Sequence, residues 1–305
     1  MSFAQDVKRE IISREIHKSC CKKAAAYGFV CFSKYFDEKG LIIHTEQSSI
    51  AQYAKKIFSD IDVQGKIFAT GKEGSRIYEF AVKESAEIDK LFEIFGHSKK
   101  DISININSDN LVCEHCVSAF LSSAFLSAGT ITNPQKDYNL EFITNKHNLS
   151  QGLTALLKGH DFLPGNIVRK GSNIIYFKAS EQIEDLLTFM GASGAALEIM
   201  NLKVYKDFRN KANRITNCET ANIDKMVEAN GQTLSAIKYL KQQGAYETMP
   251  ENLREAAKLR EENPEISLKE LAACFNPPLS KSGLCHRLRR ISEIANALSE
   301  RNKNV

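Results

Sequence analysis

The stretch Ser267–Leu298 has the sequence SLKELAACFNPPLSKSGLCHRLRRISEIANAL and predicts two helices separated by a tight break. Ser267 stands three residues before Glu270, which is the capping-box spacing that starts a helix. Apolar residues then recur at helical spacing as far as Phe275, so we expect the first helix to span 267–275. The Asn-Pro-Pro that follows ends this helix, because proline has no backbone N–H and clashes with the preceding turn.

Ser280 is placed to cap the second helix, whose two faces differ in character. Its apolar stripe consists of Leu284, Leu288, Ile291, Ile294 and Leu298. The other face carries Lys281, Ser282, His286, Arg287, Arg289 and Arg290, with no acid in this run. This arrangement is typical of a helix-turn-helix, whose second helix enters the DNA major groove. An αα-hairpin with a solvated basic face is the alternative, but the absence of acids favours DNA binding.

The composition predicts a globular protein of two domains. The chain has 305 residues, of which 43% are hydrophobic and 26% charged. No apolar run approaches the roughly eighteen residues of a membrane span, and the N-terminus lacks the apolar core of a signal peptide. We therefore expect a cytoplasmic chain with no membrane partner, and eight cysteines that stay reduced rather than forming disulfides.

The positive charge is concentrated toward the C-terminus. Residues 203–305 contain 18 Lys and Arg against 13 Asp and Glu, whereas the whole chain has a net charge of +4. The excess lies where the predicted helix-turn-helix lies, as binding to phosphates requires. It supports double-stranded DNA as a partner and association with the nucleoid.

The first two hundred residues contain a repeat with a period of about 95 residues. Three landmarks recur in the same order: Cys21 faces Cys116, Gly74–Tyr78 faces Gly171–Tyr176, and Ile88–Gly96 faces Ile183–Gly191. Predicted strands are Leu41–Thr45, Lys66–Thr70, Ile77–Val82, Asn139–Thr144, Asn166–Arg169 and Ile174–Lys178. Predicted helices are Cys20–Phe32, Ser48–Ser59, Ser85–Phe95, Glu114–Ala128, Asn148–Leu157 and Ser180–Phe189. The pattern predicts an α+β domain of two related halves.

Two of these helices, Cys20–Phe32 and Glu114–Ala128, are rich in Ala, Ser and Gly. Such small residues let two backbones approach closely, so we expect the two helices to pack together at a pseudo-twofold axis. The stretch Leu121–Gly129 resembles a degenerate LAGLIDADG motif, and Ala26–Lys34 resembles its partner. In LAGLIDADG homing endonucleases these helices form the central pair.

The departures from that motif bear on catalysis. The resemblance implies an acidic metal ligand just before the final glycine of each motif, but those positions are Ala128 and Ser33, and the first closing glycine is Lys34. None of these side chains coordinates a hard cation as a carboxylate would. We therefore expect that the scaffold persists without nuclease activity and that the protein is not an enzyme.

Between the repeat and the helix-turn-helix lies a predicted helical linker with breaks at Gly231 and Gly244. On a helix, three asparagines share one face with basic neighbours, and the candidate residues here are Arg209, Asn210, Asn213, Arg214 and Asn217. Asn is a poor helix former, so a specific role is expected. The asparagines either satisfy polar groups at a domain junction or bind phosphates, and their lack of charge favours the junction.

The motif NxxNRxxNCETAN at 210–222, followed by PENLREAA and SLKELA…PPLSKSGLCHRLRRI, resembles the WhiA family. The resemblance extends over the whole chain, including the MSFAQDVKREI start. It implies a DNA-binding regulator, tied to sporulation transcription in filamentous actinobacteria and to cell division and chromosome segregation in other Gram-positive bacteria. It also implies a helix-turn-helix similar to the promoter-reading region of sigma factors. The candidate DNA-contacting positions that carry over are Lys281, Ser282, Leu284, His286, Arg287 and Arg290. For Leu284, as for Leu288, its place in the apolar stripe favours the core over a DNA contact.

A few cysteines have spacing that suggests metal binding. Cys113-Glu-His-Cys116 has zinc-ligand spacing, and Cys20 and Cys21 with His17 are further donors. If the two repeat halves pack as expected, these clusters start the two central helices and can approach each other. Adjacent cysteines are awkward co-ligands, however, and cysteine is a frequent small buried residue. We therefore expect no metal and no cofactor, and no catalytic constellation is visible.

The sequence predicts a degenerate LAGLIDADG-like domain at 1–200 (repeats 1–96 and 97–200), a helical linker at 201–244 and an all-α helix-turn-helix domain at 245–305. The predicted function is sequence-specific DNA binding in transcriptional regulation. Possible protein partners are a second DNA-bound regulator, a sigma factor or a division protein. The alternatives are a nuclease with relocated acids and a division-associated interaction scaffold whose DNA binding is incidental.

Overall fold

The computed structural model describes residues 2–71, 76–99 and 103–303, so Met1 and the Gly74-Ser75 part of one repeat landmark lie outside the described residues. The chain divides into two compact units, Met1–Lys206 and Asp207–Val305. Each unit has its own hydrophobic core.

The first unit contains two copies of one order of elements, preceded by α1 (Phe3–Ser13). The first copy comprises α2 (Ser19–Cys31), β1 (Tyr35–Asp37), β2 (Gly40–Thr45), α3 (Ser48–Ser59), β3 (Lys66–Thr70), β4 (Ile77–Val82) and α4 (Ser85–Phe95). The second, after the 3-10 turn η1 (Ser108–Asn110), comprises α5 (Glu114–Ala128), β5 (Gly129–Ile131), β6 (Leu140–Thr144), α6 (His147–Lys158), β7 (Gly165–Arg169), β8 (Ser172–Phe177) and α7 (Ser180–Met190). This order confirms the predicted α+β repeat.

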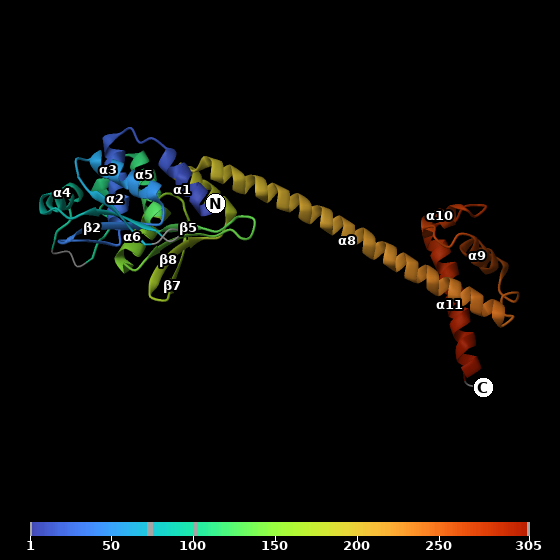
Figure 1. Ribbon diagram of the computed structural model, residues 1–305. Coiled ribbons are helices and arrows are strands. Elements are labelled where there is room, and N and C mark those ends of the chain that lie inside the picture. The colour runs from blue at the N-terminus through green and yellow to red at the C-terminus, as the bar shows by residue number, and fades with distance from the viewer. Residues whose placement is uncertain (1, 72–75, 100–102, 304–305) are drawn as a thin grey trace. The chain divides into compact units, whose positions relative to one another are not determined.

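The two copies form antiparallel sheets of matching topology, β1-β2-β4-β3 and β5-β6-β8-β7. The register matches as well, because Leu41 pairs with Val82 in one sheet and Leu140 with Phe177 in the other. Figure 1 shows the strands along one side of the first unit and helices α2, α3 and α5 on the other. The edge strands β1 and β5 were not predicted, because three residues carry too little alternation to indicate a strand.

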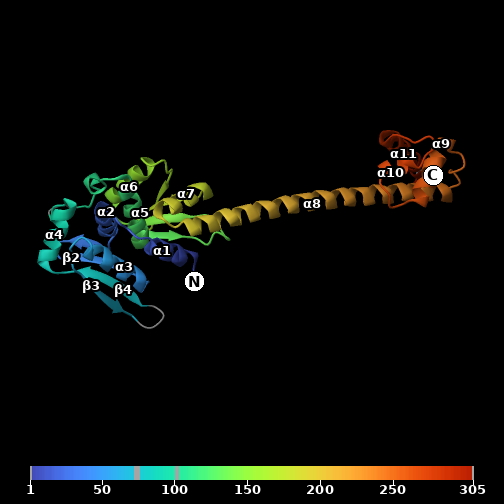
Figure 2. The ribbon, with the colours of Figure 1, turned by 90° about the horizontal axis from the view of Figure 1, so that it is seen from above.

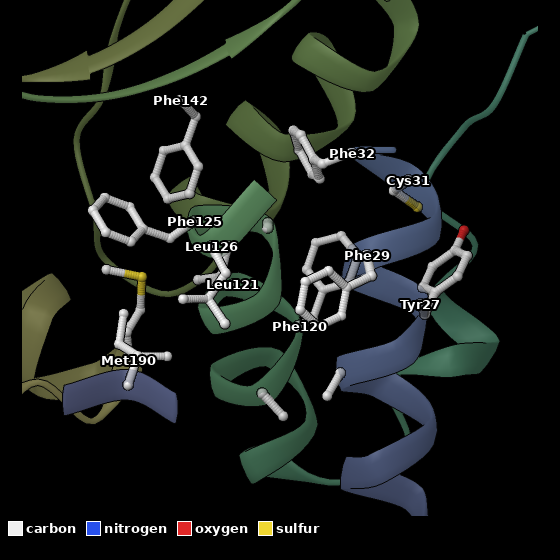
Figure 3. Close-up of a cluster of buried hydrophobic side chains, with 14 of the residues drawn as sticks. Tyr27, Phe29, Cys31, Phe32, Phe120, Leu121, Phe125, Leu126, Phe142 and Met190 are labelled. Atoms are coloured by element: carbon white, nitrogen blue, oxygen red, sulfur yellow. The ribbon is translucent and has the colours of Figure 1, made fainter. Parts of the chain in front are cut away.

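Helices α2 and α5 lie side by side at the centre of the first unit (Figure 2). A Cβ on Gly28 of α2 would come within 2.4 Å of the Phe120 carbonyl oxygen of α5, so the two backbones are almost in contact there. Around this crossing, aromatic side chains from both helices fill the core, among them Tyr27, Phe29 and Phe125 (Figure 3). The prediction that the two small-residue helices pack together is confirmed.

The longest helix is α8 (Ser193–Gln242). Ala195, Ala196 and Ile199 near its start belong to the first core, and Ile237 and Leu240 near its end belong to the second. Within the described residues, no helix has both the length and the hydrophobicity needed to cross a membrane.

One of the two breaks predicted in this segment is wrong. The helix continues through Gly231, where the cost of an exposed helical glycine, about 1 kcal/mol, is small against the continuous hydrogen bonding on either side. The break at Gly244 is confirmed, because α8 ends at Gln242 and Gly244 adopts a φ of +68°.

The second unit is all helical. After the end of α8 come α9 (Glu251–Glu262), α10 (Leu268–Ala273) and α11 (Lys281–Lys303). Its core consists of Ile237, Leu240, Met249, Leu253, Ala256, Ala257, Leu271, Ala272, Phe275, Leu284, Leu288, Ile291 and Ala295. Each of the four helices contributes to this core, so α10 and α11 are held on a rigid support.

Candidate nucleic-acid interface

The capping box predicted at the start of α10 is present. The Ser267 hydroxyl accepts a hydrogen bond from the Glu270 backbone N–H (3.3 Å), and the Ser267 N–H donates to Glu270 Oε2 (2.9 Å). The helix ends at Ala273, two residues earlier than predicted, although Phe275 remains buried in the core. A hydrogen bond from the Leu279 N–H to the Ala272 carbonyl (2.9 Å) closes the turn back onto α10.

Ser280 caps α11, as predicted. Its hydroxyl accepts from the Gly283 N–H (3.1 Å), and its carbonyl accepts from the Leu284 N–H (3.0 Å). The first turn of α11 contains no acid, and Lys281 and Ser282 are exposed there. The positive end of the helix dipole is therefore open to an anion, with a lysine beside it.

The apolar stripe of α11 faces the core of its own unit. Leu284 is 0% exposed and packs in one cluster with Leu288 and with Leu253 and Ala256 of α9. The inclusion of Leu284 among the DNA-contacting candidates is therefore wrong, because its side chain cannot reach a ligand without opening the core. Its place in the apolar stripe is the physical reason.

The face opposite this stripe is exposed and basic. Arg290 Nη1 pairs with Glu293 Oε2 at 2.9 Å, and Arg289 Nε lies 3.5 Å from the other oxygen of Glu293. The nearby Arg290 guanidinium holds the pKa of Glu293 below its usual range. The two guanidinium groups are more than half exposed, so these pairs contribute little to stability and the arginines can exchange the carboxylate for a phosphate. His286 is exposed on the same face.

Arg287 is engaged within the unit. Its Nη1 lies 3.6 Å from Glu255 Oε2, it donates a hydrogen bond to the Asn252 carbonyl (3.4 Å), and its guanidinium lies 5.4 Å from the Phe275 ring centre. The side chain is 24% exposed. Arg287 therefore links α11 to α9 and to the turn after α10, and its proposed DNA contact stays a prediction.

Arg260 is a structural residue of the site that the sequence analysis missed. It is 0% exposed, and its Nη1 donates to the carbonyl oxygens of Asn263 (3.2 Å), Pro264 (3.4 Å) and Ile266 (3.0 Å). These bonds hold the loop between α9 and α10, and burial lowers the pKa of the guanidinium. Its spacing from Leu253 (i, i+7) places it on the apolar face of α9, and this was the available signal.

The candidates on α8 are all exposed: Arg209, Asn210, Asn213, Arg214 and Asn217. Their helical placement is confirmed, so the three asparagines share one face of α8. Whether they bind phosphate or serve a domain junction stays a prediction.

A lysine from outside the helix binds near the C-terminal end of each central helix. Lys146 Nζ donates to the Cys31 carbonyl at the end of α2 (3.1 Å), and Lys8 Nζ donates to the Leu126 carbonyl near the end of α5 (3.3 Å). Burial lowers the pKa of both amines, that of Lys8 to about 8. Ser33 is buried and donates to the Val30 carbonyl (2.7 Å).

Four cysteine sulfurs meet at the opposite ends of these two helices. The Sγ atoms of Cys20, Cys21, Cys113 and Cys116 all lie within 4.8 Å of one another. Within the described residues, no other group of three or more His, Cys, Asp or Glu has a metal-binding arrangement. The two cysteine clusters therefore approach each other at the start of the central helices, and the adjacent Cys20 and Cys21 both lie in the first turn of α2 within reach of Cys113. His17 is not part of the group.

Comparisons with known proteins identify relatives over the whole chain. A family model described as the WhiA C-terminal HTH domain matches residues 212–295, and one described as the WhiA LAGLIDADG-like domain matches residues 117–209. "Probable cell division protein WhiA" of Alkaliphilus metalliredigens is 34% identical over 322 residues, covering 100% of both chains. The protein with the same description from Thermoanaerobacter pseudethanolicus is 36% identical, covering 99% of both chains.

A solved structure shows the same fold. The crystal structure of full-length DUF199/WhiA from Thermatoga maritima matches with a TM-score of 0.60 and 20% sequence identity. The match covers 97% of this chain and 99% of that chain. The α+β unit followed by a helical unit is therefore an arrangement that this solved protein shares.

Proposed function

The chain belongs to the WhiA family, and from this membership we propose that it is a sequence-specific DNA-binding protein that regulates transcription. Because relatives have the description "Probable cell division protein WhiA", we place its targets in cell division, with chromosome segregation and sporulation as the related processes. The observation that carries the proposal is the exposed, acid-free first turn of α11 on a closed helical core.

The exposed residues of α11 have the spacing that groove insertion requires. Ser282, His286 and Arg290 follow one another at intervals of four and share a face opposite the buried Leu284. At the start of this face, Lys281 and the helix N–H groups supply a phosphate site that positions the helix. Arg290 and His286 then lie over the base edges, where an arginine pairs with guanine.

The first unit has no expected catalytic role in this proposal. The positions that would hold a hard metal ion carry Ala128 and Ser33, and the helix ends bond to Lys8 and Lys146. Ammonium groups at these ends favour a phosphate and oppose a divalent cation. We propose that residues 1–200 add backbone contacts or dock a protein partner, such as a sigma factor or a second DNA-bound regulator.

The proposal also assigns roles to the linker and to the helix-turn-helix domain. Residues 201–244 act as a linker whose exposed Arg209 and Arg214 add phosphate contacts, and residues 245–305 read the sequence. With these DNA contacts, the protein would associate with the nucleoid.

The test is binding of the full chain to a library of genomic fragments over a salt series, with the bound DNA sequenced. A regulator binds some fragments at least about a thousandfold more tightly than bulk DNA. Uniform, weak binding with a steep salt dependence would instead favour the interaction scaffold, because phosphate contacts alone give that behaviour.

A further inference from the structure

The four-cysteine cluster joins the two halves of the first unit. Cys20 and Cys21 lie in the first turn of α2, Cys113 is the N-cap of α5, and Cys116 lies in its first turn. The Sγ–Sγ distances are 3.7 Å from Cys20 to Cys113, 3.6 Å from Cys21 to Cys113, 3.5 Å from Cys113 to Cys116 and 4.0 Å from Cys21 to Cys116. Each helix supplies two sulfurs.

Four of the six Sγ–Sγ distances are thus close to the edge length of a tetrahedral metal site, and the other two pairs lie within 4.8 Å. With a Zn–S bond of about 2.3 Å, the sulfurs of a tetrahedral site stand about 3.8 Å apart. A cluster of several iron atoms would need wider spacing, because its bridging sulfides lie between the cysteines. Four thiolates also select a soft ion over magnesium or calcium.

We propose that Cys20, Cys21, Cys113 and Cys116 bind one Zn²⁺ ion that fastens α2 to α5. On binding, the four thiols release their protons to solvent, four Zn–S bonds form, and no group is oxidised or reduced. All four positions are filled by protein sulfur, so the site is structural, with no position left for substrate.

One Zn²⁺ ion with four thiolates has a net charge of −2, and the surroundings of the cluster stabilise this negative charge. Two helices begin at the cluster, and the positive ends of their dipoles offset the excess negative charge. The Cys113 N–H donates to Cys116 Sγ (3.5 Å), the kind of N–H to sulfur contact that supports a metal-bound thiolate. A cavity of about 180 Å³, whose lining includes His17, Cys21 and His115, borders the cluster.

The alternative is that these cysteines serve as small core residues. That account fits Cys31, which is 0% exposed in the core of α2. It does not fit Cys113 and Cys20, which are partly exposed and yet turned toward the other thiols. Cys21 and Cys116 also stand at equivalent places of the repeat, so each half contributes a matching sulfur to the cluster.

The experiment is metal analysis of the full chain purified with reductant and without chelator. We expect one zinc per chain in the wild type and less than a tenth of that in Cys113→Ser and Cys20→Ser. The matched controls Cys31→Ala and Cys274→Ser, which change a buried and an exposed cysteine outside the cluster, should keep one zinc.

A second measurement does not depend on folding of the variants. Mass spectrometry after alkylation of the native wild type should find the partly exposed Cys20 and Cys113 protected, and a strong chelator should make these two reactive while the buried Cys31 stays protected. Metal-free protein should also develop the visible absorption of tetrahedral Co²⁺–thiolate on cobalt titration. The proposal is overturned by a wild type without stoichiometric zinc and without this cobalt signal. Stoichiometric iron in place of zinc or disulfides among the four cysteines would also overturn it.

Discussion

Arg287 on α11 and Glu255 on α9 form an ion pair, with 3.6 Å between Nη1 and Oε2. The same guanidinium donates to the Asn252 carbonyl and lies over Phe275. The proposed recognition helix is thus fixed to its support by a residue within the basic run. A basic residue in that run is therefore not automatically a DNA contact.

Substitutions at this ion pair distinguish a role of Arg287 in stability from a role in DNA binding. Glu255→Gln removes the pair and leaves every cation in place, so we expect a loss of less than about 1 kcal/mol in free energy of unfolding and no loss of DNA affinity. Arg287→Ala also removes the hydrogen bond and the ring contact, so a larger loss of about 1–2 kcal/mol is expected. Urea unfolding and fragment binding measure the two effects. If Arg287→Ala weakens binding at unchanged stability, Arg287 is a DNA contact instead.

We predict opposite effects on stability for Gly→Ala substitutions at two positions. Gly28→Ala places a Cβ 2.4 Å from the Phe120 carbonyl oxygen, so α2 and α5 must separate, at a cost of about 1–3 kcal/mol that exceeds the gain in helix propensity. Gly231→Ala meets nothing within 4 Å in α8 and should stabilise the chain by about 0.5–1 kcal/mol. Thermal unfolding of the two variants measures both changes in stability. A neutral Gly28→Ala would contradict the close approach of the two helices.

The partly buried Lys8 makes the stability of the first unit depend on pH. Burial lowers its pKa from 10.5 to about 8, although Glu46 partly opposes this shift. Below pH 8 the folded state carries the full cost of a buried charge, and this cost disappears as the pH rises from 8 toward 10.5. Lys8→Met should therefore stabilise the chain by roughly 2 kcal/mol at pH 7, and by much less at pH 10.

Calorimetry of the wild type and of Lys8→Met at both pH values measures this difference. A Lys8→Met chain that is less stable than the wild type at pH 7 would show that the bond to the Leu126 carbonyl outweighs the cost of burial.

The spacing of apolar residues predicted most helices and strands well, because each element's own sequence determines which of its faces is buried. The bounds of α3, β3, β4, α4 and α5 agree with the prediction to the residue. The repeat predicted two matching halves, and the WhiA motif predicted the family. A short strand such as β1 carries no periodic signal, and Gly231 shows that one glycine cannot end a helix that neighbours sustain.

The site was less predictable, because side-chain contacts between helices are set by tertiary packing. The caps at Ser267 and Ser280 are local and were predicted correctly. The contacts of Arg287 with α9 depend on how two helices pack, which sequence spacing does not specify. For Arg260, spacing places the side chain on the apolar face of α9 but does not indicate the loop carbonyls that it binds. Convergence of Cys20 and Cys21 on Cys113, in contrast, follows from the packing of α2 against α5, which the small residues of the two helices predicted.

The most direct test of the account is the affinity of Lys281→Ala and Arg290→Ala for the tightest genomic fragment, measured over a salt series. Lys258→Ala, which removes an exposed lysine of α9, is the matched control. Each α11 variant should lose about 1–3 kcal/mol of binding free energy, and Lys281→Ala should also lower the salt slope by about 1. The control should bind like the wild type. If the α11 variants bind that fragment as tightly as the control does, α11 is not the helix that reads DNA.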